Sequence, residues 1–259
     1  MPEGDTVFRT ARTLDQALGG EVLTRCDLRV PAFATVDLAG ERMREVASRG
    51  KHLLMRVGES SIHSHLKMEG SWHLYRHGSR WQRPAFQARA VLETAEWVAV
   101  GFDLGVLEVV PLAREAEMLA WLGPDLLGAD WDAGEAVRRL GSAPERPTAV
   151  ALADQGNLAG LGNEYVNELC FLRGILPTRT VGEVPDVAGL VDLAHRLITA
   201  NRDRAERTTT GNTRRGAQSW VFARAGQPCR RCGTPIERGS LGRNTLELRN
   251  TFWCPRCQT

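Results

Sequence analysis

The 259-residue sequence lacks any apolar run of the roughly 18 residues that a membrane span needs, and its N-terminus has no basic stretch followed by an apolar one. It also has no low-complexity tract and no internal repeat. We therefore expect a cytoplasmic protein without a membrane partner. The length suffices for one large or two ordinary domains, each with its own core.

Lysine is almost missing, because only Lys51 and Lys67 occur in the whole chain. Arginine carries the positive charge, and it is unevenly spread behind the net charge of +2. From Arg202 to the C-terminus, twelve arginines and four acids give +8, so the rest of the chain carries −6. Such asymmetry indicates either a polyanion partner on the C-terminal side or a merely solvated basic surface.

Isolated cysteines are rare, since only Cys26 and Cys170 stand alone, in apolar-leaning contexts that suit inert side chains. The other four form two Cys-x-x-Cys units about twenty residues apart, namely Cys229, Cys232, Cys254 and Cys257. This spacing is typical of one tetrahedral zinc ion held by four thiolates. Two disulfides are the alternative, but they conflict with a cytoplasmic compartment. With four cysteine ligands the zinc is expected to be structural.

The first residues, Pro2-Glu3-Gly4-Asp5, are followed by apolar residues at helical spacing up to Gly19-Gly20. The pattern predicts a helix from Asp5, with Asp5 capping its first turn and Pro2 and Glu3 at its N-terminal end. Removal of Met1 would expose the proline amine, and an α-amine with a pKa of about 8 is partly neutral and nucleophilic. Many cytosolic proteins begin Met-Pro without any such role.

Short β-type runs follow, and their number predicts an antiparallel sandwich or barrel. Lys51 comes just after a glycine at a strand start, where a lysine is most often a solvated turn residue. His63, His65 and Lys67 alternate, which predicts one face of a strand; a His63/His65 metal pair has no third ligand nearby. The predicted strands are Val22-Leu28, His52-Val57, Ser60-Met68, Ser71-Tyr75, Ala88-Glu93, Trp97-Phe102 and Leu107-Val110.

Residues 112–147 read as helical pieces, and we place a domain boundary near residues 123–132. A helix should then run to about Asp154, break through three glycines, and restart at Asn163. This break predicts either a phosphate-binding nest of backbone N–H groups or a plain turn between helices. A further helix is expected over about residues 187–200, and the polar, basic segment 207–216 is expected to be a mobile loop.

The C-terminal residues 221–258 should form a β-hairpin zinc finger, with residues 249–253 as one arm ending at Cys254. Arg249 on that arm is either a surface charge or a probe for backbone phosphates.

These motifs occur in one chain in one order: Pro-Glu-Gly, Gly50-Lys51-His-Leu-Leu, Ile62-His-Ser-His-Leu-x-Met-x-Gly, Ala159-Gly-Leu-Gly-Asn-Glu-Tyr-Val and Arg249-Asn-Thr-Phe-Trp-Cys-Pro-Arg-Cys-Gln. The constellation covers nearly the whole chain and closely resembles the formamidopyrimidine-DNA glycosylase and endonuclease VIII family of base-excision repair enzymes. The resemblance implies double-stranded DNA with damaged bases or abasic sites as partner. It also implies a monomer with a cytoplasmic, bacterial-type location, associated with the nucleoid through that DNA.

The resemblance also implies roles for individual residues. Pro2 is the Schiff-base nucleophile and Glu3 the general acid/base. Lys51 matches the motif lysine that contacts phosphates around the lesion, and we expect it to belong to the catalytic as well as the DNA-binding residues. Asn163 and Arg249 match residues that bind the flanking phosphates. Met68 sits where the family inserts a side chain into the gap left by the extruded nucleotide. No catalytic cofactor is implied.

Two departures bear on the substrate. Members that excise 8-oxoguanine carry an arginine and a phenylalanine in a loop that corresponds to residues 102–105, where this chain has Phe-Asp-Leu-Gly. Pro-Glu-Gly also replaces Pro-Glu-Leu. Both departures favour an endonuclease VIII type of enzyme, a bifunctional DNA glycosylase/AP lyase that removes oxidised pyrimidines. The alternatives are a purine-type glycosylase and a non-catalytic protein that binds damaged DNA. The acid that members commonly carry at the position of Thr6 is absent.

The expected fold is α+β in two domains. An N-terminal helix with an antiparallel β-sandwich (1–125) precedes a helical helix-two-turns-helix domain (130–220), which carries the four-cysteine zinc finger hairpin (221–259).

Overall fold

The computed structural model describes residues 2–259, and its chain divides into two compact units, one ending at Trp121 and the other spanning Leu122–Thr259. The retention or removal of Met1 lies outside the described residues. The predicted three-part division at 1–125, 130–220 and 221–259 is finer than these two units and stays a prediction. In the described part of the chain, no helix has the length and apolarity that crossing a membrane requires.

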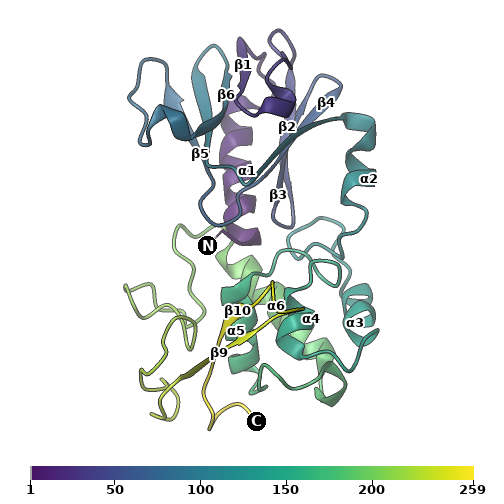
Figure 1. Cartoon of the computed structure of the whole chain (residues 1–259), viewed down its shortest axis with the longest axis vertical. Helices are drawn as coiled ribbons and strands as arrows, with labels where there is room; N and C mark the ends of the chain where they lie inside the picture. The colour runs from purple at the N-terminus through teal and green to yellow at the C-terminus, as the bar shows by residue number, and fades with distance from the viewer. Residues whose placement is uncertain (1) are drawn as a thin grey trace. The chain divides into compact units, whose positions relative to one another are not determined.

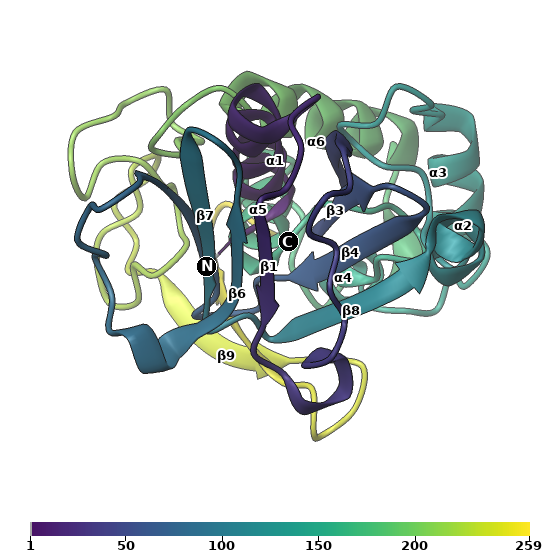
Figure 2. The same ribbon diagram turned by 90° about the horizontal axis from the view of Figure 1, so that it is seen from above.

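The first unit combines one long helix with two four-stranded antiparallel sheets, ordered β1-β6-β7-β5 and β2-β3-β4-β8. Figure 2 shows β6 and β7 on one side of α1 and β3 and β4 on the other. The elements are α1 (Gly4–Leu18), β1 (Arg25–Leu28), η1 (Pro31–Phe33), β2 (Met43–Arg49), β3 (His52–Val57), β4 (Ser60–His65), β5 (Ser71–Arg76), η2 (Ala85–Gln87), β6 (Ala88–Glu93), β7 (Trp97–Phe102), β8 (Val106–Pro111), η3 (Leu112–Arg114) and α2 (Glu115–Leu119).

One apolar core joins the helix to both sheets. Val7 and Leu14 of α1 pack in the same cluster as Met55 of β3 and Leu92 of β6, and all four are at most 2% exposed. Burial of this apolar stripe gives α1 its place along β2. The predicted α+β class with antiparallel sheets is confirmed.

The structure corrects three details of the first unit. Asp5 does not cap α1: the N-cap is Glu3 without a side-chain hydrogen bond, and the Asp5 carboxylate accepts the N–H of Thr6 at 2.7 Å. The predicted strand Ser60–Met68 ends at His65, because Lys67 adopts a left-handed φ of 53° in a turn, so Lys67 does not share a strand face with the histidines. Strand β2 was not predicted.

The second unit is helical with one hairpin (Figure 1). Its elements are α3 (Ala133–Gly141), α4 (Thr148–Ala153), α5 (Asn163–Leu172), η4 (Val181–Glu183), α6 (Val187–Asn201), β9 (Glu237–Leu241) and β10 (Arg249–Trp253). The predicted break after Asp154, the restart at Asn163 and the finger arm 249–253 are all found. Strands β9 and β10 pair antiparallel, with Arg249 opposite Leu241.

A buried carboxylate fixes the segment that follows α6. Glu168 of α5 is fully buried and accepts the backbone N–H groups of Trp220, Val221 and Phe222 at 2.7–2.8 Å, as well as the hydroxyl of Thr209. Asn201 adds bonds to both backbone groups of Thr208. The segment expected as a loop at 207–216 therefore has no regular structure but is anchored at its start.

Candidate active site and metal centre

Pro2 and Glu3 lie at the N-terminal end of α1, where Glu3 is fully buried and Pro2 is partly exposed. The carbonyl of Glu3 accepts the N–H of Val7 at 3.0 Å and so begins the helix. A buried carboxylate next to a residue whose amine would be exposed by removal of Met1 is an arrangement that can move a proton for a reaction at that amine.

The turn that carries Lys51 lies at the same end of the first unit as Pro2. The C-terminal end of α1 meets the start of β2, because Gly20 N–H donates to Met43 O at 2.7 Å and Val46 N–H donates to Asp15 Oδ1 at 2.8 Å. The helix and the strand therefore run in opposite directions. From the contact between Asp15 and Val46, the helix followed back to Pro2 and the strand followed on to Lys51 run in the same direction in space. The two lengths are similar, about 20 Å along the helix and about 17 Å along the strand.

Lys51 occupies a two-residue hairpin loop with Gly50, whose φ is 57°, between the paired residues Arg49 and His52. The glycine is required there because the left-handed conformation strains residues with a Cβ. Lys51 is partly buried.

Next to this turn, three histidines lie together. His52 Nδ1 is 2.8 Å from His63 Nε2, and the ring of His65 meets that of His52 edge-on at 5.1 Å. Burial, together with the neighbouring histidines and lysines, lowers the pKa of His52 to about 3, so the cluster is neutral near pH 7. Among the described residues, the histidines do not form a group suited to a metal ion.

Met68 stands on the turn between β4 and β5 and is 62% exposed. The turn is closed by a bond from Gly70 N–H to Leu66 O at 2.9 Å, and His65 Nδ1 accepts the N–H of Lys67 at 2.9 Å. These bonds present the methionine side chain to solvent on a fixed backbone.

In the second unit, α5 and β10 bring together Asn163 and Asn250, which are 87 positions apart. Asn163, the first residue of α5, donates its side-chain N–H to the carbonyl of Asn250 at 2.9 Å, and Asn250 adjoins Arg249. Four residues further along α5, Asn167 accepts the N–H of Phe252 at 2.6 Å. Asn163 and the exposed Arg249 therefore lie at one edge, where α5 begins. Sequence reasoning missed Asn167 and Asn250, although Asn167 is one helical turn after Asn163.

In the glycine-containing break before α5, several backbone N–H groups donate hydrogen bonds to other groups of the second unit. Gly156 N–H donates to Asp154 Oδ1, Ala159 N–H to Pro124 O and Gly160 N–H to Gln155 Oε1. At residues 156–160 the structure thus favours the plain turn between helices over the phosphate-binding nest.

A pocket of about 470 Å³ opens beside α5. Arg207 and Glu164 form an ion pair at its wall with a separation of 2.8 Å, and the guanidinium lies 4.8 Å from the ring centre of Tyr165. Gln218 and Ser219 add further polar groups to the lining. The pocket therefore offers both donors and acceptors to a small polar ligand.

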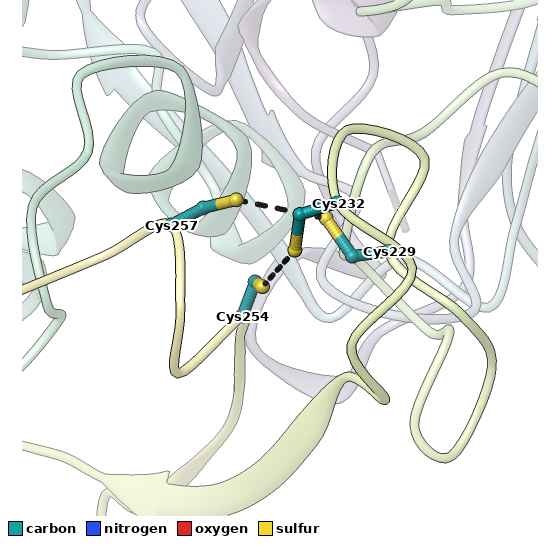
Figure 3. A group of neighbouring side chains, drawn as sticks. All are labelled: Cys229, Cys232, Cys254 and Cys257. Carbon is teal, nitrogen blue, oxygen red and sulfur yellow. Dashed lines mark hydrogen bonds between the residues drawn. The ribbon is translucent and has the colours of Figure 1, made fainter.

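The four paired cysteines converge on one point, as Figure 3 shows, with all four Sγ atoms within 4.8 Å of one another. Cys232 Sγ lies 3.5 Å from Cys254 Sγ, and Cys229 Sγ lies 4.0 Å from Cys257 Sγ. Disulfides are excluded because all four thiols are free. Zn–S bonds of about 2.3 Å in a tetrahedron place sulfurs about 3.8 Å apart, so the cluster fits a metal of this kind.

The two remaining cysteines are not part of any such group. Burial raises the pKa of Cys170 to about 12 and also raises that of Cys26. Both thiols therefore stay protonated, in agreement with the expected inert role.

Comparison with known proteins adds the family. The model of the formamidopyrimidine-DNA glycosylase N-terminal domain matches residues 1–103. The chain is 53% identical to the DNA-(apurinic or apyrimidinic site) lyase Nei2 of Mycolicibacterium smegmatis, in an alignment that covers all of this chain and 99% of the relative. It is 52% identical to Endonuclease 8 2 of Mycobacterium bovis, in an alignment that covers all of both chains. Endonuclease 8 of Klebsiella pneumoniae is 32% identical over the full length of both chains.

Solved structures show the same fold. A complex of MutM with DNA containing carbocyclic 8-oxo-G and a complex of Lactococcus lactis Fpg with abasic-site DNA each align over all of both chains with a TM-score of 0.83, at 21% identity.

The chain belongs to the formamidopyrimidine-DNA glycosylase and endonuclease VIII family, whose members are DNA glycosylases and AP lyases of DNA repair. The family resemblance and the enzyme class that it implied are confirmed. Within the family, its similarity is greater to the Endonuclease 8 2 relatives than to Endonuclease 8 1 of Mycobacterium tuberculosis, which is 33% identical.

Proposed function

We propose that this protein removes oxidised pyrimidines from double-stranded DNA through the secondary amine of Pro2 and then cuts the strand by β- and δ-elimination. The observation that carries the proposal is the partly exposed Pro2 next to the fully buried Glu3 at the start of α1. Pyrimidine lesions are proposed because residues 102–105 lack the arginine and phenylalanine of the purine-type loop.

The chemistry needs no metal at the reaction centre. The Pro2 nitrogen gives up its proton and bonds to C1′ of the sugar as the bond from C1′ to the base breaks, and the base leaves with a proton. Protonation of O4′ then breaks the bond from C1′ to O4′, which opens the sugar ring and leaves a double bond between C1′ and the Pro2 nitrogen. The resulting iminium ion acidifies the C2′ hydrogen, whose removal expels the 3′ phosphate. A second elimination expels the 5′ phosphate, and water releases the sugar fragment from proline. Glu3 is proposed to carry the protons.

The remaining predicted residues are proposed to hold the DNA. Lys51, Asn163 and Arg249 contact phosphates near the lesion, and Met68 enters the gap that the extruded nucleotide leaves. The proposed parts are a catalytic domain (1–125), a helix-two-turns-helix domain (130–220) and a zinc finger (221–259) with one structural zinc ion on its four cysteines.

A lesion panel tests the proposed substrate class. Duplexes that carry one oxidised pyrimidine, 8-oxoguanine, a formamidopyrimidine or an abasic site are incubated with the protein, and base release and strand cleavage are measured separately. Faster release of the oxidised pyrimidine is expected. Faster release of the purine lesions would contradict the pyrimidine assignment, and tight binding without cleavage of any substrate would show a damage-binding protein.

Salt dependence separates the two proposed phosphate contacts of the second unit. Arg249→Ala is expected to weaken binding to abasic-site duplex and to reduce the slope of log K against log salt by about one, because one cation is lost. Asn163→Ala is expected to weaken binding with an unchanged slope, because the amide is neutral. Titrations at several salt concentrations give both quantities.

Arg196→Ala is the matched control, because this arginine is exposed on α6 and paired with Asp192. It is expected to leave affinity and slope unchanged. A slope for Arg249→Ala equal to that of the unchanged protein would refute the phosphate contact.

A further inference from the structure

The connection between β5 and β6, residues 77–87, is rich in basic and aromatic side chains and contains no acid. Arg80, Trp81, Arg83 and Phe86 lie in it, and Arg89 follows at the start of β6. This combination suits a partner that has both negative charge and flat faces for stacking, as a nucleic acid does.

Trp81 packs the connection onto the first unit. Its ring meets Phe102 edge-on at 5.8 Å and lies 6.5 Å from the ring of Tyr75, whose hydroxyl accepts the N–H of Gln82 at 3.0 Å. Phe86, five residues later, is 77% exposed. The segment therefore partly buries the ring of Trp81 and leaves the ring of Phe86 exposed.

The backbone beneath Phe86 is held from several sides. Gln87 O accepts the N–H of Asp103 at 2.9 Å, and the guanidinium groups of Arg29 and Arg89 donate to Ala85 O and Phe86 O, both at 3.3 Å. A ring on a fixed backbone loses little conformational freedom when it is covered, which favours binding.

Arg83 ties this connection to the turn that carries Met68. Its Nη1 donates to the carbonyl of Glu69 at 3.1 Å and pairs with Asp103 Oδ2 at 3.0 Å. The turn after β7 also packs on the Met68 turn, because a Cβ on Gly105 would lie 2.2 Å from Lys67 Cγ. Three segments meet here, and their exposed apolar side chains are Met68 and Phe86.

We propose that Phe86 is a second side chain that enters the DNA base stack, contacting the base of the undamaged strand that loses its partner, beside Met68 in the gap. Arg83 is a positioning residue, because its cation is paired with Asp103 and its bonds hold both segments. Extrusion of one nucleotide leaves a gap and an unpaired base, and two exposed apolar side chains on segments tied together by Arg83 match these two openings. The inference rests on the proposed function, since it assumes a damaged duplex as substrate.

Phe86→Ala tests the inference with two substrates. On an abasic-site duplex, cleavage kcat/KM is expected to fall about 10-fold, as for loss of one stacked base. On the same abasic strand without a complement, the change is expected to stay within about two-fold, because no opposite base exists. Val22→Ala, at an exposed apolar site of the same unit, should leave both substrates unaffected, and Phe86→Trp should retain activity.

A binding measurement completes the test without requiring catalysis. With 2-aminopurine opposite the abasic site, binding of the unchanged protein is expected to alter the fluorescence through stacking, and Phe86→Ala at saturation should largely abolish this change. An equal loss on both substrates, or no loss on the duplex, would overturn the inference. If the unchanged protein cleaves neither substrate, the proposed function fails, and the fluorescence result alone decides the inference.

Discussion

Placing the Pro2 nitrogen in a peptide bond is expected to reduce strand cleavage at abasic sites by at least about 1000-fold. Insertion of leucine between Met1 and Pro2 does this, since a bulky second residue keeps the methionine and an amide nitrogen is not a nucleophile. Single-turnover cleavage of an abasic-site duplex measures the effect. DNA affinity should change little, because no phosphate contact is altered.

Glu3→Gln is the companion variant, because it leaves the amine free and removes only the carboxylate. Its cleavage rate is expected to fall by about 100-fold, the size of a lost general acid/base. Cleavage by the leucine-extended chain at a rate within ten-fold of the unchanged protein would refute the role of Pro2. Intact mass must also show that Met1 is removed in the active protein.

Loss of the proposed zinc site is expected to weaken DNA binding strongly. Cys254 is fully buried and belongs to the apolar cluster that joins the finger to Phe171 of α5. Cys254→Ser should abolish binding of the proposed zinc ion and weaken binding to abasic-site duplex by about 100-fold or more, because metal binding and folding of such a site are coupled. Arg249 and the contact of Asn163 with Asn250 depend on the same hairpin.

Cys26→Ala is the control for this change, because Cys26 belongs to the other unit and lies outside the cysteine cluster. Zinc content per chain and affinity for DNA are measured for both variants. A Cys254→Ser protein that retains one zinc and full affinity would contradict the structural role of the metal.

The elements with clear boundaries were predictable from sequence. Strands β3, β6 and β7 have the predicted bounds, since apolar runs are bordered there by turn residues. Strand β2 escaped prediction because a bulge between Met43 and Glu45 interrupts its alternation and most of its side chains face solvent at least in part. Periodicity arguments fail where the pairing itself is irregular.

The sequence allowed us to predict which residues belong to the candidate site, but not how they are arranged in space. The sequence indicates Asn163 and Arg249 separately, but only the fold shows that the carbonyl of Asn250 accepts the Asn163 amide. Glu168 gives no signal in the sequence, because a glutamate in a helix is usually exposed. Its burial under the N–H groups of residues 220–222 follows from long-range packing.

The same holds for the residues beside Met68. Comparison of motifs shows what residues 102–105 lack. The fold brings Arg83 to the Met68 turn from a different connection, which also carries the exposed Phe86 and whose Gln87 bonds to Asp103. The pyrimidine assignment rests on the arginine and phenylalanine that residues 102–105 lack. It therefore depends on which other side chains lie beside Met68.

Borohydride trapping followed by peptide mapping tests the central claim most directly. The unchanged protein is incubated with an abasic-site duplex in the presence of borohydride, and the modified peptide is located by mass spectrometry. The proposed mechanism predicts a covalent protein–DNA adduct whose sugar fragment is attached to the nitrogen of Pro2. An adduct on Lys51 or Lys67, or strand cleavage without any trapped adduct, would contradict it.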